Sequence, residues 1–344
     1  MARTTPSRPA DIVAVFPELA PLARQTVRLH PRSGMPTAYD SSVGGPLLWP
    51  ADEPWPVCTE EHCSWVLPTS LGGVRRSRQL RAVAGRRPQQ PGAGTLTPEE
   101  RELLAAIEQT HEWTDEPNAL LPVAQLYMRD VPGLRGPEGT DVLQVLWCPL
   151  DHTEHFMPKA RLVWRSSQAV EVLLASPPEP VHVDHMGNYV PEPCALHPEV
   201  VTEYPAPYEL DDELRERIWD WGSRVKAVAE PDHPYPDEHE AYYQYELSVA
   251  PGWKVGGWEP WSFSDPRRIP CRTCKVPMVP LLTIASGEWD AGNHSWIPVE
   301  DQVSLAEPHG KRPSNDPRVR IPRENMQIYI CPVSFDHPHA ENMQ

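Results

Sequence analysis

One phrase occurs twice in this chain of 344 residues, and it limits the fold more than any other feature. At residue 43 the sequence reads VGGPLLWPADEPWPVCTEEHC, and at residue 255 it reads VGGWEPWSFSDPRRIPCRTC. Both copies place a tryptophan six residues after the valine, Trp49 and Trp261, then an acid followed by a proline, and then a close pair of cysteines. A phrase repeated in this detail indicates an internal duplication.

The similarity between the two halves continues beyond this phrase. An apolar segment follows each cysteine pair, LPVAQLYM in the first half and VPLLTIAS in the second. Each half then reads Gln-x3-Cys-Pro, beginning at Gln144 and at Gln327, with an Asp-His pair shortly afterwards. The first half is longer between its matching cysteines, and an Arg-rich insertion at about 72–96 accounts for the difference. We therefore predict two lobes related by a pseudo-two-fold axis.

Proline determines which kinds of element these lobes can contain. The chain has 44 prolines, and proline interrupts both helices and central strands. The composition favours short strands and ordered loops over a helical bundle. We predict an α+β, β-rich fold with mixed or antiparallel sheets and a few helices. The predicted lobes are residues 1–178 and 241–344, joined by a Pro-rich connection and a helix at 179–240.

Hydrophobic periodicity assigns the individual elements. Apolar residues recur at helical spacing over 209–230, and a second helix is expected after Thr97, which forms a capping-box pattern with Glu100. Residues 8–24 are expected to be a short helical segment, and residues 176–208 to be irregular. Strands are expected to begin near residues 26, 120, 141, 161, 278 and 326.

The charge balance argues against nucleic acid as a partner. The chain has 31 basic and 48 acidic residues, a net charge of −17, and therefore repels phosphate backbones. The exception is the run RRSRQLRAVAGRR at 75–87. We expect the insertion that contains this run to be solvated and mobile, with an arm for an anionic partner as the alternative.

No segment has the length and apolarity of a signal peptide or a membrane anchor. We therefore expect no membrane partner and a cytoplasmic location, where thiols stay reduced. The chain contains seven cysteines, an odd number. Clustered cysteines in a reducing compartment bind metal more often than they form a disulfide framework.

The second half offers a complete set of zinc ligands. Zinc binds about four Cys or His ligands in a tetrahedron, and two cysteines separated by two residues supply a pair from one turn. Cys271 and Cys274 have this spacing, Cys331 ends a predicted strand, and His337 follows it. We predict that these four residues bind a zinc ion.

The first half offers a parallel set with a looser spacing. Cys58 and Cys63 are separated by four residues, Cys148 ends a predicted strand, and His152 follows. We predict a second zinc ion on these four residues. A site closed by four protein ligands leaves no coordination position for water, so both zinc ions would be structural and not catalytic.

The fourth ligand of each set has alternatives. In the first half they are His62 and His155, and in the second half they are His294 and His339. Cys194 belongs to neither set. The cysteines can also be buried packing residues, because free cysteine is among the most buried residue types.

Several segments together resemble the YwqG-like family, also called DUF1963. They are Ser42–Pro46 (SVGGP), Val123–Leu126 (VAQL), Lys254–Trp258 (KVGGW) and Leu281–Ser286 (LLTIAS), the last with Thr283 where many members have glutamine. The resemblance implies a duplicated α+β fold with substantial sheet, and it implies no established activity. Association with toxin–immunity loci has been suggested for some relatives.

These observations lead to one expected function and two alternatives. We expect a zinc-stabilised binding or scaffold protein, with an inter-lobe cleft lined by the repeated tryptophans that takes an unknown protein or small molecule. One alternative is an immunity-type protein that covers a basic toxin, for which the net negative charge is suited. The other is an unrecognised hydrolase or transferase acting in the cleft.

Overall fold

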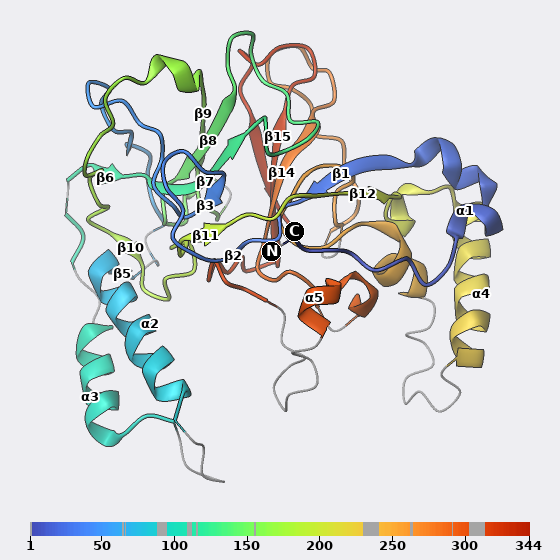
Figure 1. The fold of residues 1–344 in the computed structure, drawn as a ribbon, viewed down its shortest axis with the longest axis horizontal. Helices are drawn as coiled ribbons and strands as arrows, with labels where there is room; N and C mark the ends of the chain where they lie inside the picture. The colour runs from blue at the N-terminus through green and yellow to red at the C-terminus, as the bar shows by residue number, and fades with distance from the viewer. Residues whose placement is uncertain are drawn as a thin grey trace.

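The computed structural model contains two large antiparallel sheets with a few helices (Figure 1), which is the predicted α+β, β-rich fold. Sheet I and sheet II, as they are called below, have six strands each. Two-stranded pairs join β10 (Val183–Asp184) with β5 (Pro68–Thr69) and β4 (Val57–Cys58) with β6 (Asn118–Ala119). The structure describes residues 2–63, 65, 67–87, 95–108, 112–114, 116–154, 156–229, 241–261, 264–290, 292–302 and 314–344.

The strand orders of the two sheets correspond. Sheet I has the order β2 (Arg32–Ser33), β11 (Cys194–Ala195), β3 (Ser42–Val43), β7 (Leu121–Tyr127), β8 (Val142–Trp147) and β9 (Ala160–Arg165). Sheet II has the order β12 (Glu199–Glu203), β1 (Arg24–Arg28), β13 (Lys254–Gly256), β14 (Val279–Ala285), β15 (Asn325–Ile330) and β16 (Ala340–Met343). Each strand of sheet I therefore has a counterpart at the same place in sheet II.

The strand registers also correspond. Val43 pairs with Ala124 in sheet I, and Val255 pairs with Leu282 in sheet II. The register between β7 and β8 shifts just after Pro122, and that between β14 and β15 shifts just after Pro280. A proline cannot donate to the ladder, so an irregularity at this position has the same physical cause in both sheets. We interpret the correspondence as support for the duplication inferred from the sequence.

Over its described residues, the chain crosses twice between the two sheets. The chain passes from β1 in sheet II to β2 in sheet I, and later from β11 in sheet I to β12 in sheet II. Each sheet therefore takes strands from both sides of the boundary predicted at residue 178. Residues 176–208, expected to be irregular, contain β10 (Val183–Asp184), β11 and β12. These strands are too short to show a period of two, and their pairing with distant strands could not be seen in the local sequence.

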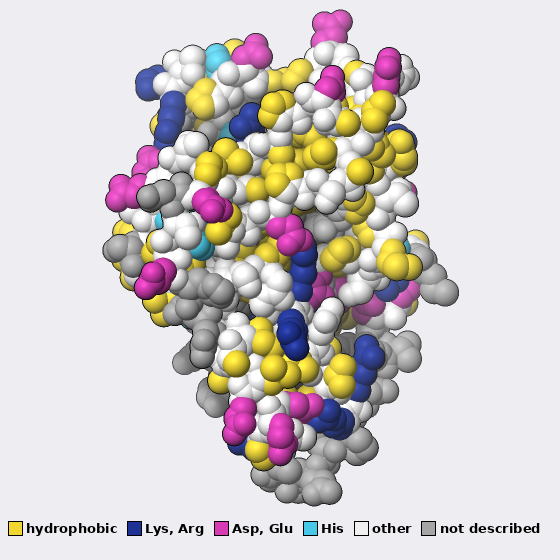
Figure 2. Space-filling model, turned by 90° about the vertical axis from the view of Figure 1, so that its left-hand side faces the viewer, with side chains coloured by type: hydrophobic (Ala, Val, Ile, Leu, Met, Phe, Trp, Pro, Cys, Tyr) yellow, Lys and Arg dark blue, Asp and Glu magenta, His cyan; other side chains and the backbone are white. Residues whose placement is uncertain are grey.

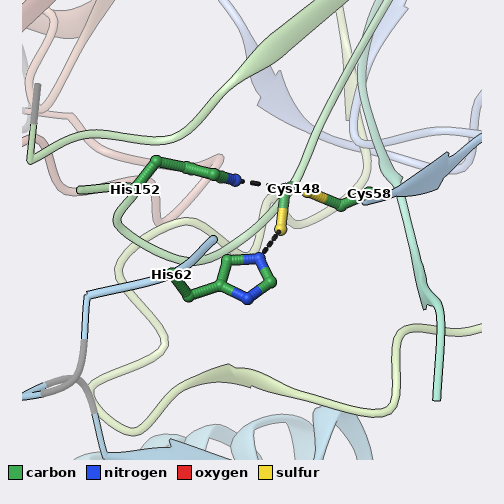
Figure 3. A group of neighbouring side chains, drawn as sticks. All are labelled: Cys58, His62, Cys148 and His152. Carbon is green, nitrogen blue, oxygen red and sulfur yellow. Dashed lines mark hydrogen bonds between the residues drawn. The ribbon is translucent and has the colours of Figure 1, made fainter. Parts of the chain in front are cut away.

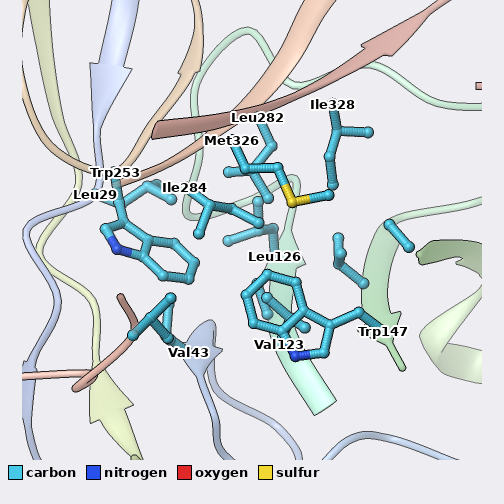
Figure 4. Close-up of a cluster of buried hydrophobic side chains, with 14 of the residues drawn as sticks. Leu29, Val43, Val123, Leu126, Trp147, Trp253, Leu282, Ile284, Met326 and Ile328 are labelled. Carbon is cyan, nitrogen blue, oxygen red and sulfur yellow. The ribbon is translucent and has the colours of Figure 1, made fainter. Parts of the chain in front are cut away.

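The core lies between the two sheets, as Figure 4 shows. Val123 and Trp147 extend from sheet I into the same hydrophobic cluster as Leu282 and Ile328 from sheet II. Trp253, beside them, donates its indole N–H to the carbonyl of Ala285 at 2.9 Å. Because side chains fill the space between the sheets, the expected cleft between two lobes is not found there.

Helices α1 (Ile12–Val15) and α4 (Asp212–Ala229) lie at one end of the molecule and α2 (Leu71–Gly85) and α3 (Pro98–Ile107) at the other, with the short α5 (Val299–Gln302) between them (Figure 1). Helix α4, expected from its apolar spacing, packs with α1 in a second hydrophobic cluster. Helix α3 begins with the predicted capping box of Thr97 and Glu100. No helix in the described ranges is long and apolar enough to cross a membrane. The shorter elements are β4 (Val57–Cys58), β5 (Pro68–Thr69), β6 (Asn118–Ala119), α5 (Val299–Gln302), the 3-10 turns Pro17–Leu22, Ser167–Ala169, Pro207–Glu209 and His294–Trp296, and a π-helix at Tyr243–Ser248.

The Arg-rich insertion is more ordered than the sequence suggested. Helix α2 (Leu71–Gly85) covers much of it, with Ser70 as its N-cap and α3 packed beside it; residues 88–94 lie outside the described residues. Four of its arginines, Arg75, Arg78, Arg81 and Arg87, pair with acids of the same chain, as Arg81 does with Glu108 at 2.8 Å. Figure 2 shows basic and acidic side chains interspersed over this end of the molecule. On this face, acidic side chains interrupt the positive charge of the insertion.

Candidate metal centres

The four residues predicted as zinc ligands in the second half lie together. The ligand atoms of Cys271, Cys274, Cys331 and His337, called centre 2 below, are all within 4.8 Å of one another. The sulfurs of Cys274 and Cys331 are 3.5 Å apart, and Nδ1 of His337 is 3.2 Å from the Cys331 sulfur. Ligands around a tetrahedral zinc ion are about 3.3–3.8 Å apart, given zinc–ligand bonds of about 2.0–2.3 Å. The arrangement has the dimensions of such a site.

The backbone around centre 2 explains why the cysteines converge. The chain turns tightly after Cys271, where its carbonyl accepts the N–H of Lys275 at 3.0 Å and its own N–H donates to Val276 at 2.9 Å. Lys275 has a φ of 64°, a left-handed conformation that reverses the chain and is uncommon for a residue with a side chain. The turn places both thiols on one side. The N–H of Val333 then donates to the Cys331 sulfur at 3.4 Å, which stabilises it as a thiolate ligand.

The first half contains a second cluster, called centre 1 below. It consists of Cys58, His62, Cys148 and His152, whose ligand atoms are again all within 4.8 Å of one another. Figure 3 shows the four side chains converging from two segments of the chain. Nε2 of His152 is 3.2 Å from the Cys58 sulfur, and Nε2 of His62 is 3.2 Å from the Cys148 sulfur.

The predicted ligand Cys63 is not part of centre 1, and His62 takes its place. Cys63 is fully buried and packs in an apolar cluster with Trp49. His62 forms an antiparallel bridge with His152, and successive residues of an extended chain point to opposite sides. His62 therefore faces the centre, while Cys63 faces the core. A regular signal in the sequence was available, because Cys58-x3-His62 and Cys148-x3-His152 have the same spacing.

The remaining candidate residues lie elsewhere. His339 is bound to the carbonyl of Ala160 at 3.1 Å and pairs with Glu341, and His294 is outside both clusters. Cys194 is buried in β11, as expected of the cysteine in neither set. His155 lies outside the described residues.

Neighbouring groups orient the ligands of centre 1. Nδ1 of His152 lies 3.2 Å from the carbonyl of Met157, which leaves Nε2 free to face the centre. Asn118 donates its side-chain N–H to the Cys148 sulfur at 3.7 Å. The ring of His62 stacks on Trp113 with centroids 5.5 Å apart. Such partners, which hold a ligand in place without touching the metal, are typical of metal sites.

The two thiols of centre 1 have pKa values shifted in opposite directions. The bond to Cys148 lowers the pKa of the Cys58 thiol to about 2, while burial and then Cys58 raise the pKa of Cys148 well above its ordinary value. The two sulfurs cannot both carry a negative charge at this distance without a positive partner. A divalent metal ion supplies that charge and deprotonates coordinating thiols.

Both centres occupy corresponding places in the fold. Cys148 directly follows β8, and Cys331 directly follows β15, the counterpart of β8 in sheet II. In each half, the segment at the end of the repeated phrase supplies two further residues, Cys58 and His62 in centre 1 and Cys271 and Cys274 in centre 2. Each centre therefore joins the end of a sheet strand to a loop far away in the sequence. Two buried Cys/His clusters with the geometry of a metal site such as zinc are the main chemical feature of the described residues.

A further group of ionisable side chains was missed by the sequence analysis. Glu288, only 3% exposed, accepts from Arg28 at 3.4 Å and lies 2.5 Å from Nδ1 of His30. Burial opposes its ionisation, but His30, Arg28 and Arg32 together lower the pKa of Glu288 to about 2. Because these groups bind one another inside the protein, we assign them a structural role. Charged residues scattered along the sequence carry no local signal of such pairing.

No protein-family model matches the chain, and a search of curated proteins finds no match. The assignment of function therefore depends on the geometry of the sites.

Proposed function

We propose that this chain is a zinc-stabilised binding or scaffold protein that is related to the YwqG-like family and holds one structural zinc ion at each of its two centres. The observation that carries the proposal is the pair of four-residue Cys/His clusters at corresponding ends of two matching sheets. A cytoplasmic location fits this function, because a reducing compartment keeps the thiols available for metal.

The donor sets favour zinc over other biological metals. Centre 1 offers two sulfurs and two imidazole nitrogens, and centre 2 offers three sulfurs and one nitrogen. Thiolate and imidazole ligands in a compact tetrahedron are typical of zinc, whereas calcium and magnesium require oxygen ligands. Since each set is complete with four protein ligands, the metal would have no open position for a substrate, and its role would be to stabilise the fold.

The structural role follows from what the centres connect. In sheet II, centre 2 links residues 271–274 to the end of β15, and Cys274 and Cys331 are 57 positions apart in the sequence. A metal cross-link over such a distance restricts the unfolded chain and fixes loops that contain little regular structure. The scaffold so stabilised would present a binding site for a partner, whose chemistry is addressed below.

Metal analysis of protein purified without chelator tests this proposal. We expect close to two zinc ions per chain by mass spectrometry, and we expect cobalt(II) exchanged into the protein to give the visible absorption of tetrahedral thiolate sites. The variants Cys58→Ser and Cys331→Ser should each retain one ion. A wild-type protein that contains no zinc and takes up no cobalt would show that the cysteines are packing residues.

A further inference from the structure

The two matching sheets differ at one buried position. Gln144 in β8 and Gln327 in β15 pair with Gln125 and Thr283 at corresponding registers. The Gln144 amide donates to the carbonyl of Leu48 at 2.8 Å and to Gln125 at 2.9 Å. The Gln327 amide is equally buried, and neither its nitrogen nor its oxygen has a hydrogen-bond partner among the described residues.

The repeated phrase explains this difference. In the first half, Leu48 lies over the sheet, donates its N–H to Gln125 at 2.7 Å and accepts from Gln144. The position corresponding to Leu48 in the second copy is Pro260, which has no N–H, and Gln125 is replaced by Thr283. The second half therefore lacks both the loop N–H group and the sheet glutamine that are hydrogen-bonded to each other in the first half.

The tryptophans of the two phrases differ in the same way. The indole N–H of Trp49 donates to the carbonyl of Glu53 at 3.1 Å. Trp261, at the matching place, is 4% exposed, and its indole N–H has no partner in the part of the chain that the structure describes. Almost all buried polar groups of proteins are hydrogen-bonded, so an unpaired set at one place indicates that something else binds there.

A cavity of about 790 Å³ lies next to Trp261. Trp261 lines it, as do Asn325 at the start of β15 and Trp289, whose indole N–H is also unpaired. Gln327 is the next residue of β15 on the same face as Asn325, because alternate residues of a strand share a face. Gln344 is joined to Asn325 by two backbone hydrogen bonds. The side-chain amide nitrogen of Gln344 also has no partner among the described residues.

The chemistry of these groups selects the kind of ligand. Unpaired indole and amide N–H groups require an acceptor, and a free amide oxygen requires a donor; a hydroxyl group supplies both. An organic cation offers no acceptor to the N–H groups. An anion is disfavoured because the described lining carries two carboxylates, Asp290 and Glu324, against one cation, Arg320. Trp261 and Trp289 contribute apolar surface to the lining, against which the carbon face of a sugar ring can pack.

We propose that this cavity, together with the Gln327 face of sheet II, is the binding site of a small neutral carbohydrate. Its volume is within the range of about 300–1,000 Å³ typical of small-molecule sites. The site rests on the proposed binding function, and it shares no residue with the ligands of centre 1 or centre 2. Metal content and carbohydrate binding therefore test the two proposals separately.

The experiment uses the full-length, metal-loaded protein with glucose, maltose and N-acetylglucosamine as probes. Saturation-transfer NMR detects contact of the protein with the sugar protons, and the difference in tryptophan fluorescence between the wild type and Trp261→Phe reports on Trp261. We expect at least one sugar to bind, and we expect Gln327→Met and Trp261→Phe each to weaken it at least ten-fold. Trp65→Phe, at an exposed tryptophan outside the cavity lining, should bind that sugar like the wild type.

Three results would overturn the proposal. The first is that none of the sugars binds up to its solubility limit, in which case ordered water alone satisfies the unpaired groups. The second is that a sugar binds equally well to Gln327→Met and to the wild type, which would place the binding elsewhere. The third is that tetramethylammonium or acetate binds at this site and the sugars do not. Thermal melts of both variants, expected to match the wild type, establish that lost binding is not lost folding.

Discussion

Cys148 and Cys331 occupy the same place in the two sheets, each directly after the strand that pairs with β7 or with β14. Each sulfur is 3.2 Å from an imidazole nitrogen, that of His62 in one case and of His337 in the other. The histidines come from opposite directions along the chain, because His62 precedes its cysteine and His337 follows it. The two centres therefore agree in position and differ in how the chain completes them.

Separate substitution of the neighbouring residues His62 and Cys63 tests which of them is a ligand of centre 1. We expect His62→Ala to lower the zinc content from about two ions per chain to about one, because His62 faces the cluster. Cys63→Ala should keep both ions, because that thiol packs in the apolar cluster and not at the centre. Metal analysis of the two variants, purified identically, measures the difference. Loss of zinc in Cys63→Ala alone would restore the ligand set inferred from the sequence.

Removal of one ligand from centre 2 should destabilise the protein strongly. Metal binding to a site that exists only in the folded chain contributes directly to folding, so we expect Cys274→Ser to lower the free energy of unfolding by at least about 3 kcal/mol. Calorimetry should show a lower Tm, and a chelator should lower the Tm of the wild type more than that of the variant. Cys194→Ser, which changes a buried cysteine outside both centres, is the control: its chelator response should equal that of the wild type.

The two glutamines should respond oppositely to the same substitution. Gln144→Met leaves the carbonyl of Leu48 without a partner and removes one of the two hydrogen bonds that the Gln125 side-chain oxygen accepts, so we expect a cost of about 1–3 kcal/mol. Gln327→Met removes a buried amide that has no partner among the described residues, so it should be neutral or stabilising. Urea unfolding of both variants gives the comparison. Equal destabilisation by the two substitutions would contradict the difference between the sheets.

The buried carboxylate of Glu288 should make the stability of the protein depend on pH. Burial opposes its charge, but His30 and two arginines lower its pKa from the ordinary 4.5 to about 2. Because the folded pKa is the lower one, the stabilisation is complete above about pH 4.5 and is lost as the pH falls toward 2. The shift corresponds to about 3 kcal/mol. We expect Glu288→Gln to be less stable than the wild type at pH 7, with the gap narrowing below pH 4.5.

Denaturant titrations at several pH values measure this gap. The variant keeps both metal centres, so loss of zinc in acid affects the two proteins alike and cancels in the difference. A gap that stays constant between pH 7 and pH 3 would show that the carboxylate is not stabilised by its neighbours in the folded protein.

Local patterns in the sequence were sufficient for several of the regular elements and for most residues of the two Cys/His clusters. Helix α4 follows from apolar residues at helical spacing, and α3 follows from its capping box, because both signals arise within one or two turns of chain. Centre 2 was predictable because Cys271 and Cys274 form one tight turn, and because the repeat points to Cys331 as the third thiol.

The other features of the fold and of the sites depend on contacts between residues far apart in the sequence. The exchange of β1 and β11 between the sheets joins residues more than a hundred positions apart, and no local pattern records such a pairing. The choice of His62 over Cys63 depends on which side of an extended chain faces the cluster, and only the bridge to His152 sets that. The unpaired amide of Gln327 likewise becomes visible only when Pro260 and Thr283 lie beside it, since being unpaired is a property of the packed neighbours and not of the residue itself.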